Sequence, residues 1–177
     1  MRRFASSVGI LAIVVVGGTG SAQAQEKPVP LDRIPTEIVD ALLSRFPNAR
    51  IDKCTRTSEG GAIVYDIELH QKNGRRAEAD IKEGGVYVNY EQEIDASDLP
   101  RAVRDAIDKK YPKSILKENM QETEVKGKSE RLSAYEIVLE TAGHKRVEVR
   151  VSPEGKILEE GDAEKPQELT AFARGLE

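Results

Sequence analysis

The side chains of this sequence that could do chemistry are two histidines, one cysteine and 31 acidic residues. His70 and His144 each fall beside a predicted hairpin turn, and a metal ion could bind between them if the two turns met. Parallel copies of one hairpin would keep the turns apart, and no third ligand is apparent, so we expect no metal site. Cys54 could be a nucleophile or form an intermolecular disulfide. Because no histidine lies near it as a base, we interpret it as a small apolar residue within a strand.

The acidic residues are the second source of chemistry. Acid/base catalysis needs two such groups in a cleft, but here they alternate along predicted strands, which indicates a solvated sheet face with cross-strand Arg–Glu pairs. The segment EEGDAE, residues 159–164, is as acidic as a calcium loop but lacks the spacing of an EF-hand. The motifs GxGxxG, GxxxxGK[ST], HExxH and GxSxG are absent from the sequence. We therefore predict a protein that is not an enzyme and that needs no cofactor.

The first 24 residues predict a Sec-type secretory signal peptide. Arg2 and Arg3 precede the apolar run VGILAIVVVGG, and Ala22-Gln23-Ala24 is a small-x-small cleavage site, so we expect cleavage after Ala24. A membrane anchor is the alternative, but the apolar run is too short to span a bilayer comfortably. We therefore expect a periplasmic or secreted protein that contacts the membrane only through the signal peptide, before cleavage.

The charge of the mature chain narrows the class of partner. Cleavage would leave 177 − 24 = 153 residues, and the loss of Arg2 and Arg3 would leave 25 basic against 31 acidic side chains. A net charge of −6 disfavours nucleic acid or an anionic membrane surface as the partner. Because the sequence has no Trp and only three Phe, the core must come from Val, Ile, Leu and Ala.

Two segments that lie 65 residues apart carry the same helical pattern. In each, an apolar residue recurs every four positions, and the last one is an aromatic residue followed by proline. This spacing places the apolar residues on one face of a helix, and the proline ends the helix at the aromatic residue. We interpret each stripe as a core face rather than the lining of a cofactor site. The stripes are Ile34, Ile38, Leu42 and Phe46, and Leu99, Val103, Ile107 and Tyr111.

The repeat continues downstream at an offset of 70 residues. The segment YDIEL at Tyr65 matches YEIVL at Tyr135, and RAEADI at Arg76 matches RVEVRV at Arg146. Each alternates between apolar and polar residues, which is typical of antiparallel strands with one buried face, and KNGR and TAGH supply tight turns. The five extra residues of the second copy fall within residues 117–133, where the polar composition predicts a longer hairpin loop.

These patterns predict an α+β fold of tandem units, each a helix followed by a four-stranded antiparallel sheet. The helices would pack on one face and leave the other face open. The predicted order is a signal peptide (1–24), a lead-in linker (25–33), the first repeat (34–94), the second repeat (95–161) and a polar tail (162–177) that could form a short helix.

The repeated pattern LP..V..AI...YP, followed by Y.I.L and V.V...G.I, resembles the PepSY-like family of secreted bacterial domains, which are similar to the β-lactamase inhibitory protein. The resemblance spans residues 34–160 and implies a helix packed on an antiparallel sheet, in tandem. It also implies a role in restraining secreted peptidases or other enzymes through the open sheet face. Because this chain has no Trp and its outward positions are mostly charged, no individual inhibitory residue carries over.

We therefore predict a non-catalytic module that binds or inhibits a secreted or envelope protein. The alternative is an envelope protein that senses a small ligand or a metal ion, suggested by the acidic balance and EEGDAE. The expected protein-contact face consists of Asp66, Glu68, Arg76, Glu78, Asp80, Arg146, Glu148 and Arg150.

Overall fold

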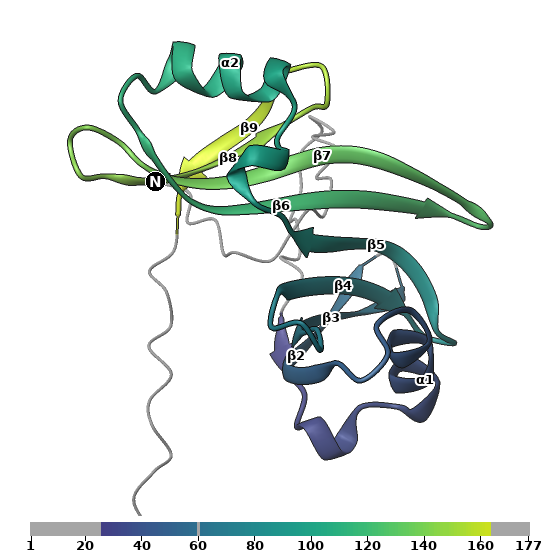
Figure 1. Cartoon of the computed structure of the whole chain (residues 1–177). Helices are drawn as coiled ribbons and strands as arrows, with labels where there is room; N and C mark the ends of the chain where they lie inside the picture. Colours follow the sequence, from purple (N-terminus) through teal and green to yellow (C-terminus); the bar gives the residue numbers. More distant parts are fainter. Residues whose placement is uncertain (1–25, 60, 164–177) are drawn as a thin grey trace, which may run out of the picture.

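The computed structural model describes residues 26–59 and 61–163, which form one antiparallel sheet of nine strands and two α-helices (Figure 1). The strands lie in the order β1 to β9, so each strand pairs only with its neighbours along the chain. The predicted α+β class is confirmed, while the finer division into two equivalent four-stranded units stays a prediction. The strands are β1 (Lys27–Pro28), β2 (Arg50–Glu59), β3 (Ala62–His70), β4 (Arg76–Lys82), β5 (Val86–Glu93), β6 (Ile115–Lys126), β7 (Ser129–Glu140), β8 (Arg146–Val151) and β9 (Ile157–Asp162).

The predicted terminal segments are only partly covered. The predicted signal peptide, residues 1–24, and residues 164–177 of the predicted tail lie outside the described residues. Within the predicted lead-in linker, β1 pairs with Thr55 and Arg56 of β2, and a short 3-10 helix, η1 (Leu31–Arg33), follows. Neither α-helix of the described part is long and apolar enough to cross a membrane.

The two α-helices, α1 (Thr36–Arg45) and α2 (Arg101–Lys110), each begin directly after a proline and end directly before an aromatic residue. Proline suits a helix start because its missing N–H needs no partner there. Phe46 and Tyr111 are the C-caps, with φ of −116° and −124°, and each backbone N–H donates to the carbonyl four residues earlier. A second 3-10 helix, η2 (Ala96–Asp98), leads into α2. The predicted helix ends are confirmed.

Each helix buries its apolar stripe against the strands that follow it. The ring of Phe46 is buried and meets Tyr90 edge-on, whereas Tyr111 is half-buried at the margin of its core. The first core contains Ile34, Ile38, Leu42, Phe46, Cys54, Tyr65, Ile67, Leu69, Ala77, Ala79 and Ile81. The second core contains Leu99, Val103, Ile107, Tyr135, Ile137, Leu139, Val147, Val149 and Val151.

The strand register places both cores on the same side of the sheet. Ala79 lies opposite Tyr90, and Tyr90 lies opposite Thr123. Two residues before Thr123, Gln121 lies opposite Tyr135 of the second core. Because paired residues, and residues two apart in a strand, point to the same side, α1 and α2 cover one common face. The opposite face has no helix on it among the described residues.

The hairpin of β6 and β7 contradicts the prediction of a longer loop within residues 117–133. Both strands are 12 residues long, and only Gly127 and Lys128 lie between them. The polar composition was misleading, because on a sheet with one uncovered face polar side chains alternate with inward ones while the backbone stays paired. In the β6–β7 hairpin the extra residues of the second copy therefore lengthen the strands rather than the loop (Figure 1).

The lengthened hairpin contacts the first helix. Glu130, near its tip, accepts hydrogen bonds from the guanidinium of Arg45 and from the Tyr90 hydroxyl, the latter at 2.9 Å. The same guanidinium lies 5.0 Å from the ring centroid of Tyr87 and 4.2 Å from that of Tyr90. This cluster ties β7 to the C-terminal end of α1, in addition to the pairing of β5 with β6.

Candidate functional site

The candidate site is the uncovered side of the sheet, which we call the open face. The structure places all eight predicted contact residues on it, because each lies at an alternate position to the residues of the cores. Glu68 lies opposite Glu78, Asp66 lies opposite Asp80, and Arg150 lies opposite Glu136. The other predicted residues on this face are Arg76, Arg146 and Glu148.

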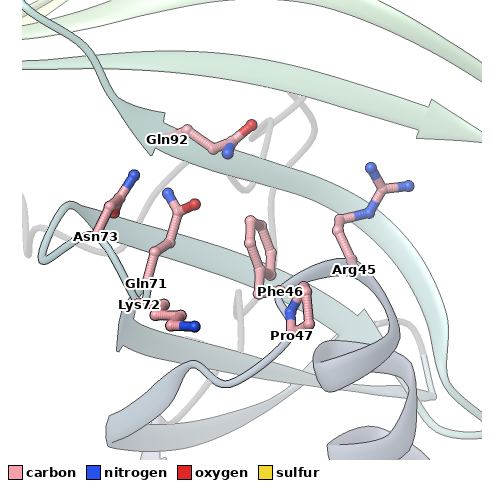
Figure 2. Close-up of a pocket in the computed structure, with 7 residues that line it drawn as sticks. All are labelled: Arg45, Phe46, Pro47, Gln71, Lys72, Asn73 and Gln92. Carbon is pink, nitrogen blue, oxygen red and sulfur yellow. The ribbon is translucent and has the colours of Figure 1, made fainter.

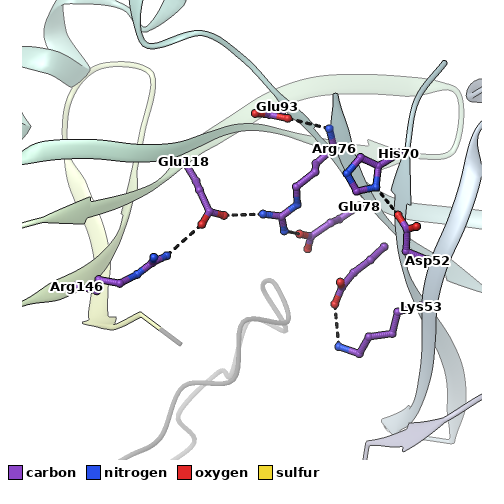
Figure 3. A network of polar contacts seen from close by, with 9 residues as sticks. Asp52, Lys53, His70, Arg76, Glu78, Glu93, Glu118 and Arg146 are labelled. Carbon is purple, nitrogen blue, oxygen red and sulfur yellow. Dashed lines mark hydrogen bonds and ion pairs between the residues drawn. The ribbon is translucent and has the colours of Figure 1, made fainter. Parts of the chain in front are cut away.

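One glutamate joins the two ends of the open face. Glu118 of β6 accepts a hydrogen bond from Arg76 of β4 at 2.6 Å and another from Arg146 of β8 at 3.1 Å. Each arginine reaches past one intervening strand, and Figure 3 shows the three side chains meeting between the two ends of the sheet. The open face is therefore curved inward, and its arginines lean toward the centre.

Four glutamates form a straight line across the middle of this face. Glu68 of β3 lies opposite Glu78 of β4, Glu78 lies opposite Glu91 of β5, and Glu91 lies opposite Glu122 of β6. Adjacent strands are about 5 Å apart, so each carboxylate has a like charge as its neighbour. We call Glu68, Glu78, Glu91 and Glu122 the glutamate row.

Burial raises the pKa values of the carboxyl groups at the centre of this face. Burial together with nearby Asp66 raises the pKa of Glu78 to about 7 and that of Asp80 to about 8. The pKa of Glu91 is held well above its ordinary value by complete burial and by Glu136, Glu78 and Glu122. The centre of the open face therefore favours neutral carboxyl groups near neutral pH.

The prediction that this sheet face is solvated is therefore wrong for its central strands. Asp80, Glu91 and Glu122 are buried, with 8%, 1% and 4% of their surface exposed. The physical reason is the inward curvature, which brings Arg76, Arg146 and their partners over the middle of the sheet. An open sheet face is solvated throughout only where it is flat.

Sequence reasoning missed the centre of this face. Glu91, Glu118, Glu122 and Glu136 were not predicted as contact residues, although all lie on the open face. The alternation of Asn89, Glu91 and Glu93 in the sequence could have identified β5. The glutamates of β6 were missed because residues 117–133 were predicted to contain a loop.

The two histidines and Cys54, the other residues that could take part in catalysis or metal binding, have ordinary surroundings. His70 pairs with Asp52 and His144 with Glu140, at 2.9 Å in the second case. Burial raises the pKa of the Cys54 thiol to about 11, which disfavours the reactive thiolate. Across residues 26–59 and 61–163, no three His, Cys, Asp or Glu side chains are placed to hold a metal ion.

The acidic segment EEGDAE is described only up to residue 163. Glu160 pairs with Lys110 and accepts a hydrogen bond from the Tyr111 hydroxyl, and Asp162 pairs with Lys145. These carboxylates are therefore used in contacts at the edge of the second core.

A shallow polar pocket lies on the helix-covered face, beside the C-terminal end of α1. It has a volume of about 320 Å³ and lies between the end of α1, the β3–β4 turn and β5 (Figure 2). A neighbouring pocket of about 430 Å³ shares three amide residues with it and adds Gln121. The shared residues are Gln71, Asn73 and Gln92. The carboxamides can bind neutral polar groups, and the charged lining residues are Arg45 and Lys72 in the first pocket and Arg75 and Glu93 in the second.

Comparisons with known proteins agree with this architecture. A protein of Bacteroides eggerthii, described as a "putative periplasmic" protein, is 14% identical with a TM-score of 0.53, and the alignment covers 72% of this chain and 88% of that one. A DUF2874 family protein of Bacteroides uniformis is 15% identical with a TM-score of 0.52, over 73% of this chain and 89% of its own. A BLIP-like protein of Bacteroides fragilis is 24% identical with a TM-score of 0.48, over 72% and 85% of the two chains.

The search of curated proteins gave no match. One family model, described as "Putative beta-lactamase-inhibitor-like, PepSY-like", matches the sequence twice, at residues 21–86 and 72–159. The two matches together span most of the chain, and the fold is that of the DUF2874 proteins. The chain therefore belongs to the PepSY-like, beta-lactamase-inhibitor-like family.

Proposed function

We propose that this protein is a non-catalytic module of the bacterial envelope that binds another exported protein through its open face. The observation that carries the proposal is a nine-stranded sheet with both helices on one side and a curved, charged surface on the other. A sheet of this kind offers a rigid concave surface to a partner.

Export is part of the proposal. It rests on the predicted signal peptide of residues 1–24 and on the periplasmic description of the related Bacteroides eggerthii protein. The lack of catalytic function rests on the chemistry of the open face. Glu68, Glu78, Glu118 and Glu122 lie in contacts with arginine or lysine, and a nucleophile with an adjacent base is not among the described residues of this face.

The proposed contacts are mainly electrostatic. The margins of the open face carry Asp66, Glu68 and Glu148 together with three arginines, and the sequence has no Trp to serve as an apolar anchor. Complementary charge directs encounter and register between proteins more than it sets affinity. We therefore expect a partner with a basic contact surface and binding that weakens as the salt concentration rises.

Capture of the partner from an envelope extract tests this function. The wild-type protein, the variant Glu78→Lys/Glu148→Lys and the variant Asp40→Lys/Asp108→Lys are immobilised separately. The last pair changes the charge by the same amount at exposed positions on α1 and α2, away from the open face. We expect the wild type and the helix variant to retain the same exported protein and the open-face variant to lose it.

Two results would contradict the proposal. Equal capture by all three forms would place the contact elsewhere, and capture by none would remove the support for a protein partner. Because Glu78 is nearly buried, circular dichroism melts must show that the open-face variant folds. The single variant Glu148→Lys provides the same test if it does not. A retained enzyme is then assayed with equimolar protein, since the inhibitory role predicts loss of its activity.

A further inference from the structure

Three members of the glutamate row have a basic partner within the chain. Lys53 lies 2.8 Å from Glu68, and Arg76 lies 3.1 Å from Glu78. Arg150 binds both carboxylate oxygens of Glu122, at 2.7 and 2.9 Å. Each of these three carboxyl groups therefore has a basic neighbour on the same face.

Glu91 is the exception. It is 1% exposed, and neither of its carboxylate oxygens has a hydrogen-bond partner within the structure described for residues 26–59 and 61–163. A buried carboxylate without donors is costly, and the great majority of buried polar side chains are hydrogen-bonded. Glu91 therefore offers two buried hydrogen-bond acceptor atoms, and neither has a donor within the described residues.

The surroundings of Glu91 are acidic on every neighbouring strand. Glu78 and Asp80 face it from β4, Glu122 from β6 and Glu136 from β7, and the nearby guanidinium of Arg150 is already bound to Glu122. Arg76 is likewise held by Glu78 and Glu118. Neither arginine can contact Glu91 without giving up part of one of these pairs.

We propose that Glu91 is the anchor position of the open face. When the partner binds, the side chains that cover Glu91 move aside, and it receives a basic side chain, a guanidinium or an ammonium group, from the bound protein. This inference rests on the proposed function and specifies the chemistry of the partner. The incoming group completes the row by giving its last carboxylate the basic neighbour that Lys53, Arg76 and Arg150 give the others.

The geometry favours an organic cation over a metal ion. A metal ion needs several oxygens within about 2.0–2.6 Å of one point, and no such group of three is present among the described residues. Carboxylates on adjacent strands are about 5 Å apart, a distance that a guanidinium with several N–H donors can span. Glu78 and Glu91, which lie opposite each other on β4 and β5, can then share one donor group.

Binding of the cation is coupled to loss of a proton. Burial and acidic neighbours favour the neutral form of Glu91, Glu136, Glu78 and Asp80 in the free protein. A cation stabilises the charged form of a carboxyl group, so it must displace a proton. Affinity should therefore rise with pH through the range of about 7 to 8, where Glu78 and Asp80 titrate, and fall in acid.

Titration calorimetry with a defined probe tests this inference. The probe is an acetylated, amidated tripeptide of arginine, and its control is the same peptide with neutral citrulline. The proteins are wild type, Glu91→Gln and Glu37→Gln, an equal charge change at an exposed position of α1. Glutamine has the shape of the protonated carboxyl group, so Glu91→Gln should fold and melt at or above the wild-type temperature.

We expect the arginine peptide to bind wild type and Glu37→Gln equally and to bind Glu91→Gln at least tenfold more weakly. A tenfold change corresponds to about 1.4 kcal/mol. Titrations in two buffers of different ionisation enthalpy should show proton release by wild type that is smaller for Glu91→Gln. The citrulline peptide should not bind.

Three outcomes would overturn the inference: equal binding by Glu91→Gln, equal binding of the citrulline peptide, or displacement of the arginine peptide by millimolar calcium with a rise in melting temperature. Each can occur while the wild type still captures an envelope protein. The capture experiment can likewise fail while the peptide binds, so failure of this inference and failure of the proposed function are distinguishable.

Discussion

We compare the first half of the structure, α1 with β1–β5, and the second half, α2 with β6–β9. The two helices end with the same backbone geometry but with different side-chain chemistry. In the first half the ring of Phe46 is enclosed by the core, with 4% of its surface exposed. In the second half Tyr111 is half-buried, and its hydroxyl donates to Glu160 at 2.6 Å. The comparison shows that the backbone device, an aromatic C-cap before proline, is independent of how deeply the ring is buried.

A pair of turn glycines also shares one backbone geometry but differs in how closely each glycine lies against its helix. Gly85 and Gly155 both have positive φ, of +76° and +84°, and both lie against the first turn of the helix of their own half. A Cβ at Gly85 would lie 2.9 Å from the carbonyl oxygen of Glu37, whereas one at Gly155 would lie 2.4 Å from that of Ala102. The second helix therefore lies closer to the glycine of its β8–β9 turn than the first helix lies to that of the β4–β5 turn.

The largest expected difference between the halves comes from the two aromatic C-caps. Phe46→Ala should lower the free energy of unfolding by about 3–5 kcal/mol, because it removes a buried ring and leaves a cavity. Tyr111→Ala should have a clearly smaller effect, since that ring is half-exposed. Urea melts of both variants measure the difference. Equal losses would show that the two rings are equally important despite their different burial.

The glycine pair gives the next largest expected effect. Gly155→Ala should destabilise by about 2–4 kcal/mol, because the methyl group meets backbone that cannot move aside and the residue keeps a left-handed φ. Gly85→Ala should lose about half as much, since its contact is longer. Thermal melts of the two variants compare them directly. A larger loss for Gly85→Ala would contradict the order of the two helix–turn contacts.

The pH dependence of stability should separate the buried carboxyl groups of the open face, including Glu136 of β7, from the exposed paired ones. Glu78 and Asp80 bind protons more tightly in the folded than in the unfolded chain, because burial raises their pKa values to about 7 and about 8. Stability should therefore fall by several kcal/mol in total as pH rises from about 5 to about 8.

Urea melts at the two pH values measure this fall, and the variant Asp80→Asn should reduce it. The paired carboxylates of the second half, Glu140 and Glu160, have lowered pKa values and titrate in more acidic solution, so they do not contribute to this window. Stability that rises between pH 5 and pH 8 would contradict the assignment.

The smallest expected effect concerns the contact between the halves. Arg45→Gln removes the guanidinium that lies over Tyr87 and Tyr90, and we expect a loss of about 0.5–1 kcal/mol. Lys110→Gln, at the corresponding end of α2, should change stability less, because Lys110 lies over the single ring of Tyr111, at 5.9 Å, and pairs with the exposed Glu160. The melting temperatures of the two variants test whether the hairpin contact stabilises the first half specifically.

The sequence predicts the elements of this fold better than their arrangement. The stripes ending at Phe46 and Tyr111 predict both helices, because helical spacing and the rule for residues before proline are local. The strands around Tyr65 and Tyr135 follow from alternation. Curvature does not, since it depends on side chains such as Arg76 that reach past a neighbouring strand.

The candidate site was predictable at its margins only. Alternation assigns the predicted charged residues to the open face, but it does not tell which of them are buried. Glu91 was missed because its importance depends on a register, opposite Glu78 and Glu122, that no local pattern encodes. The glutamates of β6 were missed for a simpler reason: their polar composition indicated a loop.

The strictly sequential order of the nine strands has a kinetic consequence. Because every ladder joins strands that are adjacent along the chain, each pairing step closes only a short loop, apart from the two that enclose a helix. Relative contact order is therefore low for a protein with so much β structure, and folding rates rise as contact order falls. Refolding should be faster than for a Greek-key sandwich of equal length, and either half could act as its nucleus.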